Sequence, residues 1–202
     1  MDEHNLVKVY TAKIPESIEI VDVLPKDRNQ EIMSTENEKV KAEKFYAWKL
    51  LEHAIFHCFG FSIEDLTFSR NQSGKWLCEK FCFSISHSHG VVAVAVSNKN
   101  IGVDIEKFEE PQKNIERILC LKEKEEYEKL LEDEKWKYLL TAFSKKESIY
   151  KKQGKGAFLP SKISTEEENV FVKNLKFSNS EYILCVCSEI MGEINIYNVS
   201  LK

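Results

Sequence analysis

The chain has 202 residues, 43% of them hydrophobic and 31% charged, and this balance is typical of a folded globular protein. The formal net charge of -4 does not favour nucleic-acid binding, so any basic groups that meet an anionic ligand must be concentrated locally. No apolar run approaches the roughly 20 residues that a membrane-spanning helix needs, and the first five residues carry acids where a signal peptide needs bases. We therefore expect a cytoplasmic protein that binds neither nucleic acid nor a membrane.

The first hundred residues combine strand patterns with a helix pattern. Apolar residues recur at helical spacing up to Gly60, which predicts a helix that ends there. The segment Val91–Val96 is almost entirely apolar, which predicts a strand buried on both faces. The expected elements are a strand at 6–10, a helix at about 27–58, a strand at 66–68, a turn at 71–74, and strands at 81–86, 91–97 and 101–106.

The second half changes composition and then returns to strands. Residues 112–152 are charged and helix-forming, and strands are expected at about 170–177, 182–187 and 193–199. An apolar strand ending in serine therefore lies near the end of each half, which is consistent with an internal repeat and equally with two unrelated strands. The six cysteines show no C-x-x-C spacing, and two of them alternate within an apolar run, so we expect reduced, buried thiols and no zinc site.

Residues 102–106, Gly-Val-Asp-Ile-Glu, place two acids on one strand. Side chains alternate faces along a strand, so Asp104 and Glu106 point the same way while the apolar residues point the other way. Two carboxylates at so short a distance raise each other's pKa, and a hard divalent cation such as Mg2+ between them removes the repulsion. The alternative is a solvated strand end at which Lys107 supplies the counter-charge.

A third carboxylate interrupts an apolar stripe on the expected helix before residue 152. The stripe contains Trp136, Leu139, Leu140 and Phe143, followed on the same face by Glu147, Tyr150 and Lys151. Acids are rarely buried without a partner, and Lys151 at i+4 can pair with Glu147. In the other interpretation, Glu147 joins the two strand acids around one metal ion and Lys151 faces an anion.

Several polar residues outside the acidic segments are compatible with phosphate binding. Residues 86–90, Ser-His-Ser-His-Gly, join two expected strands and allow close approach of an anion, although a solvated turn has the same composition. Lys75 follows a glycine turn, which by itself says little, and Lys41 and Lys44 lie on a helix face of the kind typical of solvated surface. Taken alone, the histidines and the helix lysines favour solvated surface over a binding site.

Taken together and in order, these segments resemble the Sfp-type 4′-phosphopantetheinyl transferases. The family's G-[VI]-D-[IV]-E motif is similar to residues 102–106, and its aromatic residue followed by K-E-[SA]-x-x-K is similar to residues 143–151. Its G-K-P and N-[IL]-S-H-S segments are similar to residues 74–76 and 84–88, with Trp76 where Pro is usual. The resemblance covers about residues 20–165, and the order and spacing of four motifs make it specific.

The resemblance implies an α/β (α+β) fold, a pseudo-twofold pair of similar subdomains with CoA bound between them. We expect an N-terminal subdomain at residues 1–100 and a C-terminal subdomain with the metal and catalytic motifs at residues 101–202. The implied activity is Mg2+-dependent transfer of the 4′-phosphopantetheine group of CoA to a serine of an apo acyl, polyketide or peptidyl carrier protein, with release of 3′,5′-ADP. The resemblance also implies a monomer.

The resemblance assigns roles to individual residues. Asp104, Glu106 and Glu147 would hold Mg2+ against the pyrophosphate of CoA. Glu147 would also be the general base, and Lys151 would be a catalytic residue that contacts the phosphates. The expected CoA-binding residues are Lys41, Lys44, Lys75, Ser86, His87 and Lys151.

Other functions are compatible with the same residues. One is a catalytically degenerate module that binds CoA or another nucleotide, a second is a Mg2+-dependent phosphohydrolase, and a third is a structural protein with salt-bridged helices. Residues 107–121 interleave apolar and basic residues, so a carrier protein is expected to dock there. The same pattern is typical of a helix packed on its own subdomain.

Overall fold

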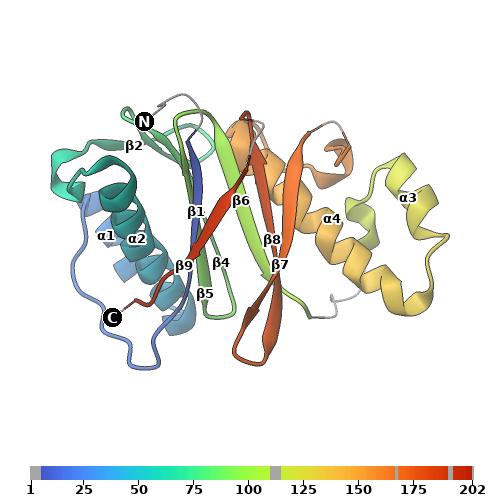
Figure 1. Cartoon of the computed structure of the whole chain (residues 1–202), viewed down its shortest axis with the longest axis horizontal. Helices are drawn as coiled ribbons and strands as arrows, with labels where there is room; N and C mark the ends of the chain where they lie inside the picture. Colours follow the sequence, from blue (N-terminus) through green and yellow to red (C-terminus); the bar gives the residue numbers. More distant parts are fainter. Residues whose placement is uncertain (1–5, 110–114, 167, 191–192, 202) are drawn as a thin grey trace.

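The computed structural model describes residues 6–109, 115–166, 168–190 and 193–201, and it shows helices on both outer sides of a central region of sheets (Figure 1). The strands are β1 (Val7–Lys13), β2 (Phe68–Arg70), β3 (Trp76–Cys78), β4 (Cys82–Ser88), β5 (Val91–Ser97), β6 (Ile101–Lys107), β7 (Val170–Phe177), β8 (Ser180–Ser188) and β9 (Asn195–Asn198). The α-helices are α1 (Lys26–Met33), α2 (Glu38–Phe59), α3 (Leu121–Tyr127) and α4 (Glu132–Gln153). The 3-10 helices are η2 (Ile63–Asp65), η3 (Ile115–Ile118) and η4 (Pro160–Lys162). The expected α/β class is confirmed.

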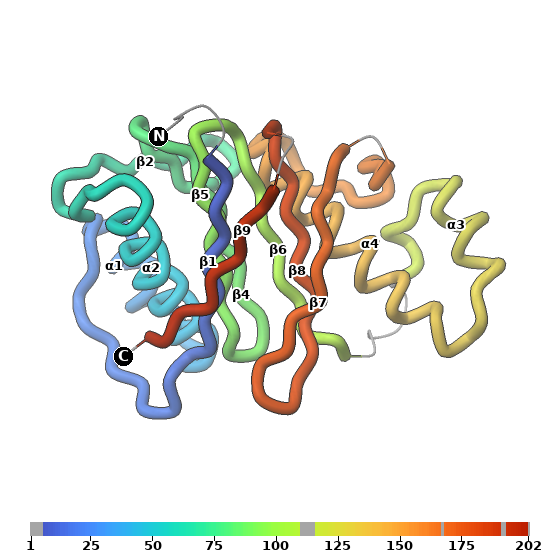
Figure 2. The backbone as a smooth tube through the Cα atoms, viewed as in Figure 1, coloured from blue at the N-terminus to red at the C-terminus, as the bar shows by residue number. Residues whose placement is uncertain are grey.

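Two antiparallel units form the centre of the structure. A four-stranded sheet has the order β4-β5-β1-β9, and a three-stranded sheet has the order β6-β8-β7. Their neighbours pair antiparallel except at one edge, where β9 runs parallel to β1 with Tyr10 opposite Tyr197. The backbone trace shows β9 lying beside β1 (Figure 2). β9 therefore forms the edge strand of the sheet that contains β1.

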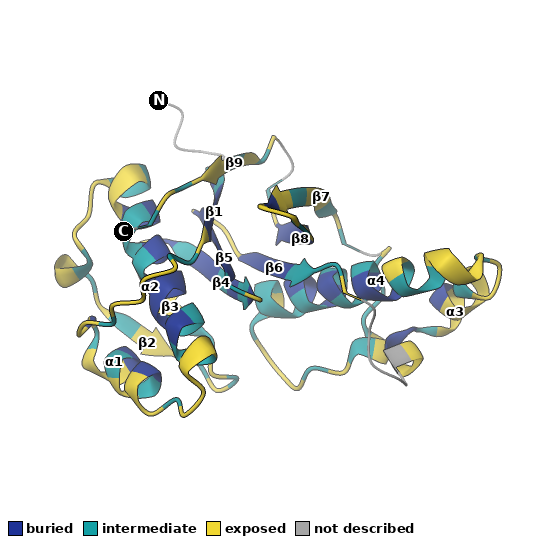
Figure 3. Cartoon of the chain, turned by 90° about the horizontal axis from the view of Figure 1, so that it is seen from below, coloured by how far each residue is buried: buried dark blue, intermediate teal, exposed yellow. Residues whose placement is uncertain are grey.

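Three layers of apolar side chains hold these elements together. Alternate residues of β5 point to opposite faces, and every one of them is buried, as the apolar run predicted. Val92 and Val94 face α2 in one core cluster, while Ala93 and Ala95 face β6 and β8 in another. On the far side, α4 packs on the three-stranded sheet through Leu140. Figure 3 shows the buried residues concentrated along these strands and the inner faces of the two long helices.

The edges of the two sheets are joined by serine hydroxyls. Strands β4 and β6 belong to different sheets, and the backbone amides of β6 donate to side chains of β4 in place of backbone carbonyls. These hydrogen bonds are Val103 N to Ser84 Oγ at 3.0 Å, Ile105 N to Ser86 Oγ at 3.3 Å, and Lys107 N to Ser88 Oγ at 3.3 Å. Side chains alternate along β4, so all three serines lie on one face, and together they accept from alternate amides of β6.

Both segments predicted to be long helices are helical, but each is divided into shorter helices. The segment expected at 27–58 is divided into α1 and α2, because the side chain of Asn37 accepts from the amides of Lys39 and Val40 and begins a new helix. Gly60 ends α2 in a left-handed conformation, as expected. The segment expected at 112–152 is divided into η3, α3 and α4 among its described residues. No glycine or proline marks those breaks, so composition alone does not show them.

All six cysteines are free thiols, and the expected burial holds for two of them. Cys185 and Cys187 are buried in β8, whereas Cys58, Cys78, Cys82 and Cys120 are half-buried. Within the described part of the chain, no helix is both long and apolar enough to cross a bilayer.

The serine bridge leads to a first prediction. Ser84→Ala removes the acceptor of the Val103 amide inside the protein, so the free energy of unfolding should fall by about 1–3 kcal/mol. Ser69→Ala on the exposed part of β2 is the control and should change it by less than about 0.5 kcal/mol. Equal denaturation midpoints for the two variants would show that the hydroxyl does not support the joint between the sheets.

Candidate functional site

Gly102 sets how closely α4 approaches β6. A Cβ added at this position would overlap the Ser148 carbonyl oxygen and the Lys152 amide nitrogen, which are backbone atoms of α4. Only a residue without a side chain allows the helix to lie against the strand at this distance. Asp104 and Glu106 follow at alternate positions on the same face, so this close contact brings α4 to the two acids.

Asp104 is buried at 2% exposure and is held by partners from two other elements. Its Oδ1 accepts from Ser86 Oγ of β4 at 2.9 Å and from Lys151 Nζ of α4 at 2.7 Å. Its Oδ2 is buried and has no hydrogen-bond partner. Buried carboxylate oxygens are normally satisfied, so the unused oxygen indicates a position where a further cation or donor fits.

Glu106 lies two residues along the strand, and its Oε2 accepts from Ser88 Oγ at 2.9 Å. Burial and the neighbouring charge of Asp104 raise the pKa of Glu106 from its ordinary value near 4.5 to about 7, although the Ser88 hydroxyl opposes the shift. The carboxyl group of Glu106 therefore holds its proton more tightly than that of an exposed glutamate, and a nearby divalent cation would oppose this effect.

Glu147 and Lys151 come from successive turns of α4. Lys151 Nζ lies 2.7 Å from Asp104 Oδ1 and 3.9 Å from Glu147 Oε2, so the strand acid is its nearer partner. Burial alone would lower the pKa of Lys151, but the charges of Asp104 and Glu147 outweigh it and raise that pKa. Burial and Asp104 raise the pKa of Glu147, while Lys151 opposes the shift.

The donor set suits a hard divalent cation. Three carboxylates lie around Lys151, and each influences the ionisation of the lysine. Oxygen ligands of this kind are those that Mg2+ prefers. Among the described residues, no group of three His, Cys, Asp or Glu side chains is already arranged as a metal site. The fit therefore rests on the unused Asp104 oxygen and on the chemistry of the carboxylates.

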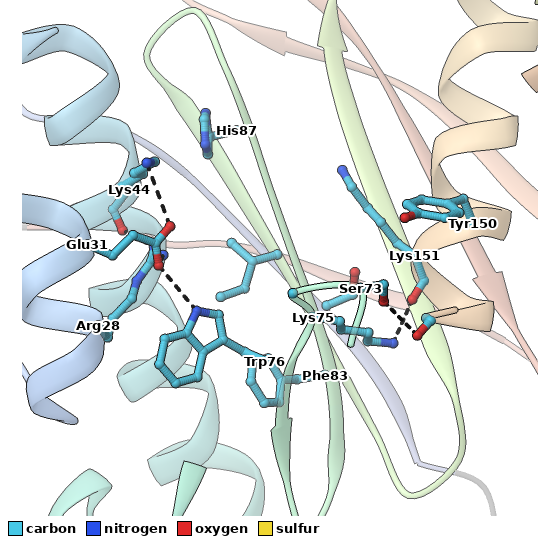
Figure 4. Close-up of a pocket in the computed structure, with 14 residues that line it drawn as sticks. Arg28, Glu31, Lys44, Ser73, Lys75, Trp76, Phe83, His87, Tyr150 and Lys151 are labelled. Atoms are coloured by element: carbon cyan, nitrogen blue, oxygen red, sulfur yellow. Dashed lines mark hydrogen bonds and ion pairs between the residues drawn. The ribbon is translucent and has the colours of Figure 1, made fainter. Parts of the chain in front are cut away.

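A cavity of about 300 Å³ opens next to this cluster, between α1 and α2 on one side and the end of α4 on the other (Figure 4). Lys151 lines it, so the cavity and the carboxylate cluster share a residue. Its other lining residues include Arg28, Glu31, Lys44, Lys75, Trp76, Phe83, His87 and Tyr150. Basic side chains together with the aromatic rings of Trp76, Phe83 and Tyr150 suit an anionic ligand that also carries a flat group.

The turn between β2 and β3 closes one end of the cavity. Asn71 Nδ2 donates to the carbonyl of Gly154, and Ser73 Oγ donates to the same oxygen at 2.8 Å. Lys75 Nζ donates to the carbonyl oxygens of Lys151 at 2.6 Å and Ile101 at 3.2 Å. Burial lowers the pKa of Lys75. The turn thus satisfies carbonyl groups at the end of α4 and fixes that end beside β6.

His87 is positioned from α2. Its Nδ1 lies 2.9 Å from Glu43 Oε2, and the other oxygen of Glu43 accepts from the Gly90 amide at 2.7 Å. Burial would raise the pKa of Glu43, but the bonds from His87 and Gly90 hold it below its usual value. One carboxylate therefore orients the imidazole and fixes the turn between β4 and β5.

The residues expected to bind CoA are divided between the cavity and its surroundings. Lys44, Lys75, His87 and Lys151 line the cavity, and Ser86 lies behind it, against Asp104. Lys41 is ion-paired with Glu38 at 2.6 Å and does not contribute to the lining.

Sequence reasoning missed Arg28 and Glu31, both of which line the cavity. The sequence gives little sign of their role, because an arginine three residues before a glutamate in α1 is an ordinary helical ion pair. It also missed the supporting roles of Glu43, Asn71 and Ser88, which act through other residues.

Residues 107–121 were expected to dock a carrier protein, but two of their apolar side chains are buried inside this chain. Residues 110–114 lie outside the described residues. Ile118 and Leu119 are buried against Leu139 and Ala142 of α4, so these apolar side chains pack on their own unit.

Comparison with known proteins gives two matches. Residues 100–189 match the family model described as the 4′-phosphopantetheinyl transferase superfamily. The chain is 30% identical over 155 residues to a 4′-phosphopantetheinyl transferase, Sfp, of Bacillus subtilis (strain 168), and the alignment covers 68% of each chain. The family match contains β6 and α4, which carry the three carboxylates and Lys151.

Gly102→Ala tests the contact between β6 and α4. Because the added methyl group meets helix backbone, we expect a loss of about 1–3 kcal/mol or more in unfolding free energy. Gly156→Ala is the control, since its added Cβ meets nothing within 4 Å and the cost is confined to its positive φ. A Gly102→Ala protein as stable as wild type would contradict the close contact.

A third prediction concerns pH in the absence of divalent cations. Glu106 has a raised pKa when folded, so its contribution to stability falls as pH rises from about 4.5 through about 7. Relative to wild type, Glu106→Gln should gain stability across this interval, up to an upper limit of about 3 kcal/mol. Urea denaturation at several pH values measures the difference, and Glu64→Gln on the exposed η2 is the control. Parallel pH profiles for wild type and Glu106→Gln would contradict the assignment.

Proposed function

Because the chain belongs to the 4′-phosphopantetheinyl transferase superfamily, we propose that it transfers the 4′-phosphopantetheine group of CoA to a serine of an apo carrier protein. The other product is 3′,5′-ADP. The observation that carries the proposal is the shared position of Lys151, which contacts the carboxylate cluster and lines the basic cavity. A phosphate group in the cavity would thus lie beside the acids that suit a metal ion.

We propose that Asp104, Glu106 and Glu147 hold Mg2+, and that the unused oxygen of Asp104 is one of its ligands. When bound, Mg2+ supplies charge neutralisation at the pyrophosphate oxygens. Lys151 would turn from Asp104 towards the phosphates, where its positive charge favours the negatively charged leaving group.

The group transfer exchanges one phosphorus–oxygen bond for another. The carrier serine oxygen bonds to the phosphorus next to the pantetheine, the bond to the bridging oxygen breaks, and 3′,5′-ADP leaves with that electron pair. Glu147 is the proposed general base for the serine proton, and burial raises its pKa, which makes its carboxylate a stronger base than an exposed glutamate. Chemistry of this kind depends mainly on positioning and on charge neutralisation.

In this proposal the CoA phosphates meet Lys44, His87 and Lys151, which line the cavity from both sides. His87 is held at Nδ1 by Glu43, so Nε2 is the ring nitrogen that would face the ligand. Lys75 and Ser86 would act by placing Lys151 and Asp104, in agreement with their hydrogen bonds. Lys41 would contribute positive charge from outside the cavity.

We also propose that residues 1–100 and 101–202 are similar subdomains related by a pseudo-twofold axis. Each contains a 22-residue helix packed on an antiparallel sheet, and the cavity lies between them, which supports this relation. The exception is β9, which joins the sheet of the first subdomain. The proposal includes a cytoplasmic monomer and a carrier protein of the acyl, polyketide or peptidyl type.

Intact-mass spectrometry of an apo acyl carrier protein tests the activity. With CoA and Mg2+ present, the carrier should gain the mass of one phosphopantetheinyl group, and EDTA should prevent the gain. Asp104→Asn and Glu147→Gln should each reduce the rate by about 100-fold or more, whereas Glu64→Gln should leave it unchanged.

Two results would replace the proposal with another function. Binding of CoA without modification of acyl, polyketide or peptidyl carriers would indicate a binding module. Hydrolysis of CoA with no carrier protein present would indicate a phosphohydrolase.

A further inference from the structure

The carboxylate of Glu31 occupies the centre of a cluster of positive charges at one end of the cavity. Arg28 Nη1 donates to Glu31 Oε2 at 2.8 Å, and Arg70 Nη2 contacts the same oxygen. Lys44 Nζ lies 3.6 Å from Oε1, and the indole nitrogen of Trp76 donates to Oε2 at 3.4 Å. Figure 4 shows Glu31 between Arg28, Lys44 and Trp76.

The groups around Glu31 are held by contacts of their own. Arg28 is 5% exposed, lies over the ring of Trp48 at 5.1 Å, and donates through Nη2 to the Lys44 carbonyl at 2.8 Å. Arg70 lies over the ring of Trp76 at 4.3 Å. The Nε of Arg28 is buried without a partner, so the cluster retains an unused donor. The geometry is that of an anion site whose present anion is a side chain.

The charge of this internal anion persists near neutral pH. Burial would raise the pKa of Glu31, but the charges of Arg28, Arg70 and Lys44 outweigh it and hold the pKa below its usual value. Three positive charges and one negative charge thus leave less attraction for a further anion than the basic residues alone would provide.

The cluster lies at the opposite end of the cavity from Lys151 (Figure 4). CoA carries negative charge in two places, the pyrophosphate and the 3′-phosphate on the ribose. With the pyrophosphate beside Lys151, the Glu31 end is the place where a second phosphate would enter. That phosphate would share donors with a fixed carboxylate and would be repelled by it.

We propose that Glu31 fills this second anion subsite and makes the chain weakly selective between CoA and dephospho-CoA, which lacks the 3′-phosphate. This inference rests on the proposed function of the cavity. The pyrophosphate and pantetheine arm are the same in both donors, so both can deliver the transferred group. Glu31 acts here as a specificity-determining residue for the donor nucleotide.

Isothermal titration calorimetry at fixed ionic strength, with CoA and dephospho-CoA, tests the proposal. Wild type should prefer CoA by about tenfold or less, because Glu31 already occupies donors of Arg28, Arg70 and Trp76 and its charge repels a 3′-phosphate. Glu31→Gln should raise that preference by about three- to tenfold, since it keeps the side-chain shape and removes the repulsion. Glu52→Gln, which removes an acid paired with Lys49 outside the cavity, should leave the preference unchanged.

A further pair of ligands tests the subsite without a variant. Adenosine 3′,5′-bisphosphate and adenosine 5′-monophosphate differ only in the 3′-phosphate, and wild type should bind them with affinities within about tenfold of each other. A preference of about a hundredfold or more for the bisphosphate would overturn the inference, whether or not the Glu31→Gln protein folds. So would an unchanged CoA preference in a folded Glu31→Gln protein, as judged by its thermal unfolding.

The carrier-modification assay separates this inference from the proposed function. Transfer from both donors at rates within about tenfold supports it, and transfer from CoA alone overturns it while leaving the transferase function in place. No transfer from either donor removes the function on which the inference rests, and the inference falls with it.

Discussion

The row of serine hydroxyls between β4 and β6 is the constraint on which the rest of the site depends. Backbone-to-backbone hydrogen bonds would make β4 and β6 neighbours in one continuous sheet. Here serine side chains accept from the β6 amides instead, and they join two separate sheets at their edges. Two of the three hydroxyls also donate to the acids of β6, Ser86 to Asp104 and Ser88 to Glu106. The joint that connects the sheets therefore also fixes the carboxylates, and the other face of β4 presents His87 to the cavity.

Charge compensation within the protein is the second organising feature. Asp104 is paired with Lys151 at one end of the cavity, and Glu31 is paired with Arg28, Lys44 and Arg70 at the other. Each arrangement resembles what a bound ligand would create, with a cation beside the acids and an anion among the bases. Buried charges need such partners, because an unpaired buried charge costs far more than an exposed one.

The sequence predicted which strand and helix carry the site better than it predicted where the helices begin and end. Alternation along β6 and helical spacing along α4 placed Asp104, Glu106, Glu147 and Lys151 on faces that do meet, because these periods survive folding. The division of the long helices was not predictable from composition, since hydrogen bonds to side chains decide it. Arg28 and Glu31 were missed for a related reason, because an ion pair within one helix gives no sign that Arg70, far along the chain, completes it.

The position of β9 has a consequence for how the chain assembles during synthesis. Hydrogen bonds between β1 and β9 join residues near opposite ends of the sequence, with Thr11 opposite Asn198. On a ribosome, one edge of β1 would stay unpaired until residues 195–198 emerge, because pairing over so long a sequence separation forms late. Exposed strand edges promote association between chains, so this interval is when a nascent chain is most exposed to a neighbouring copy or a chaperone.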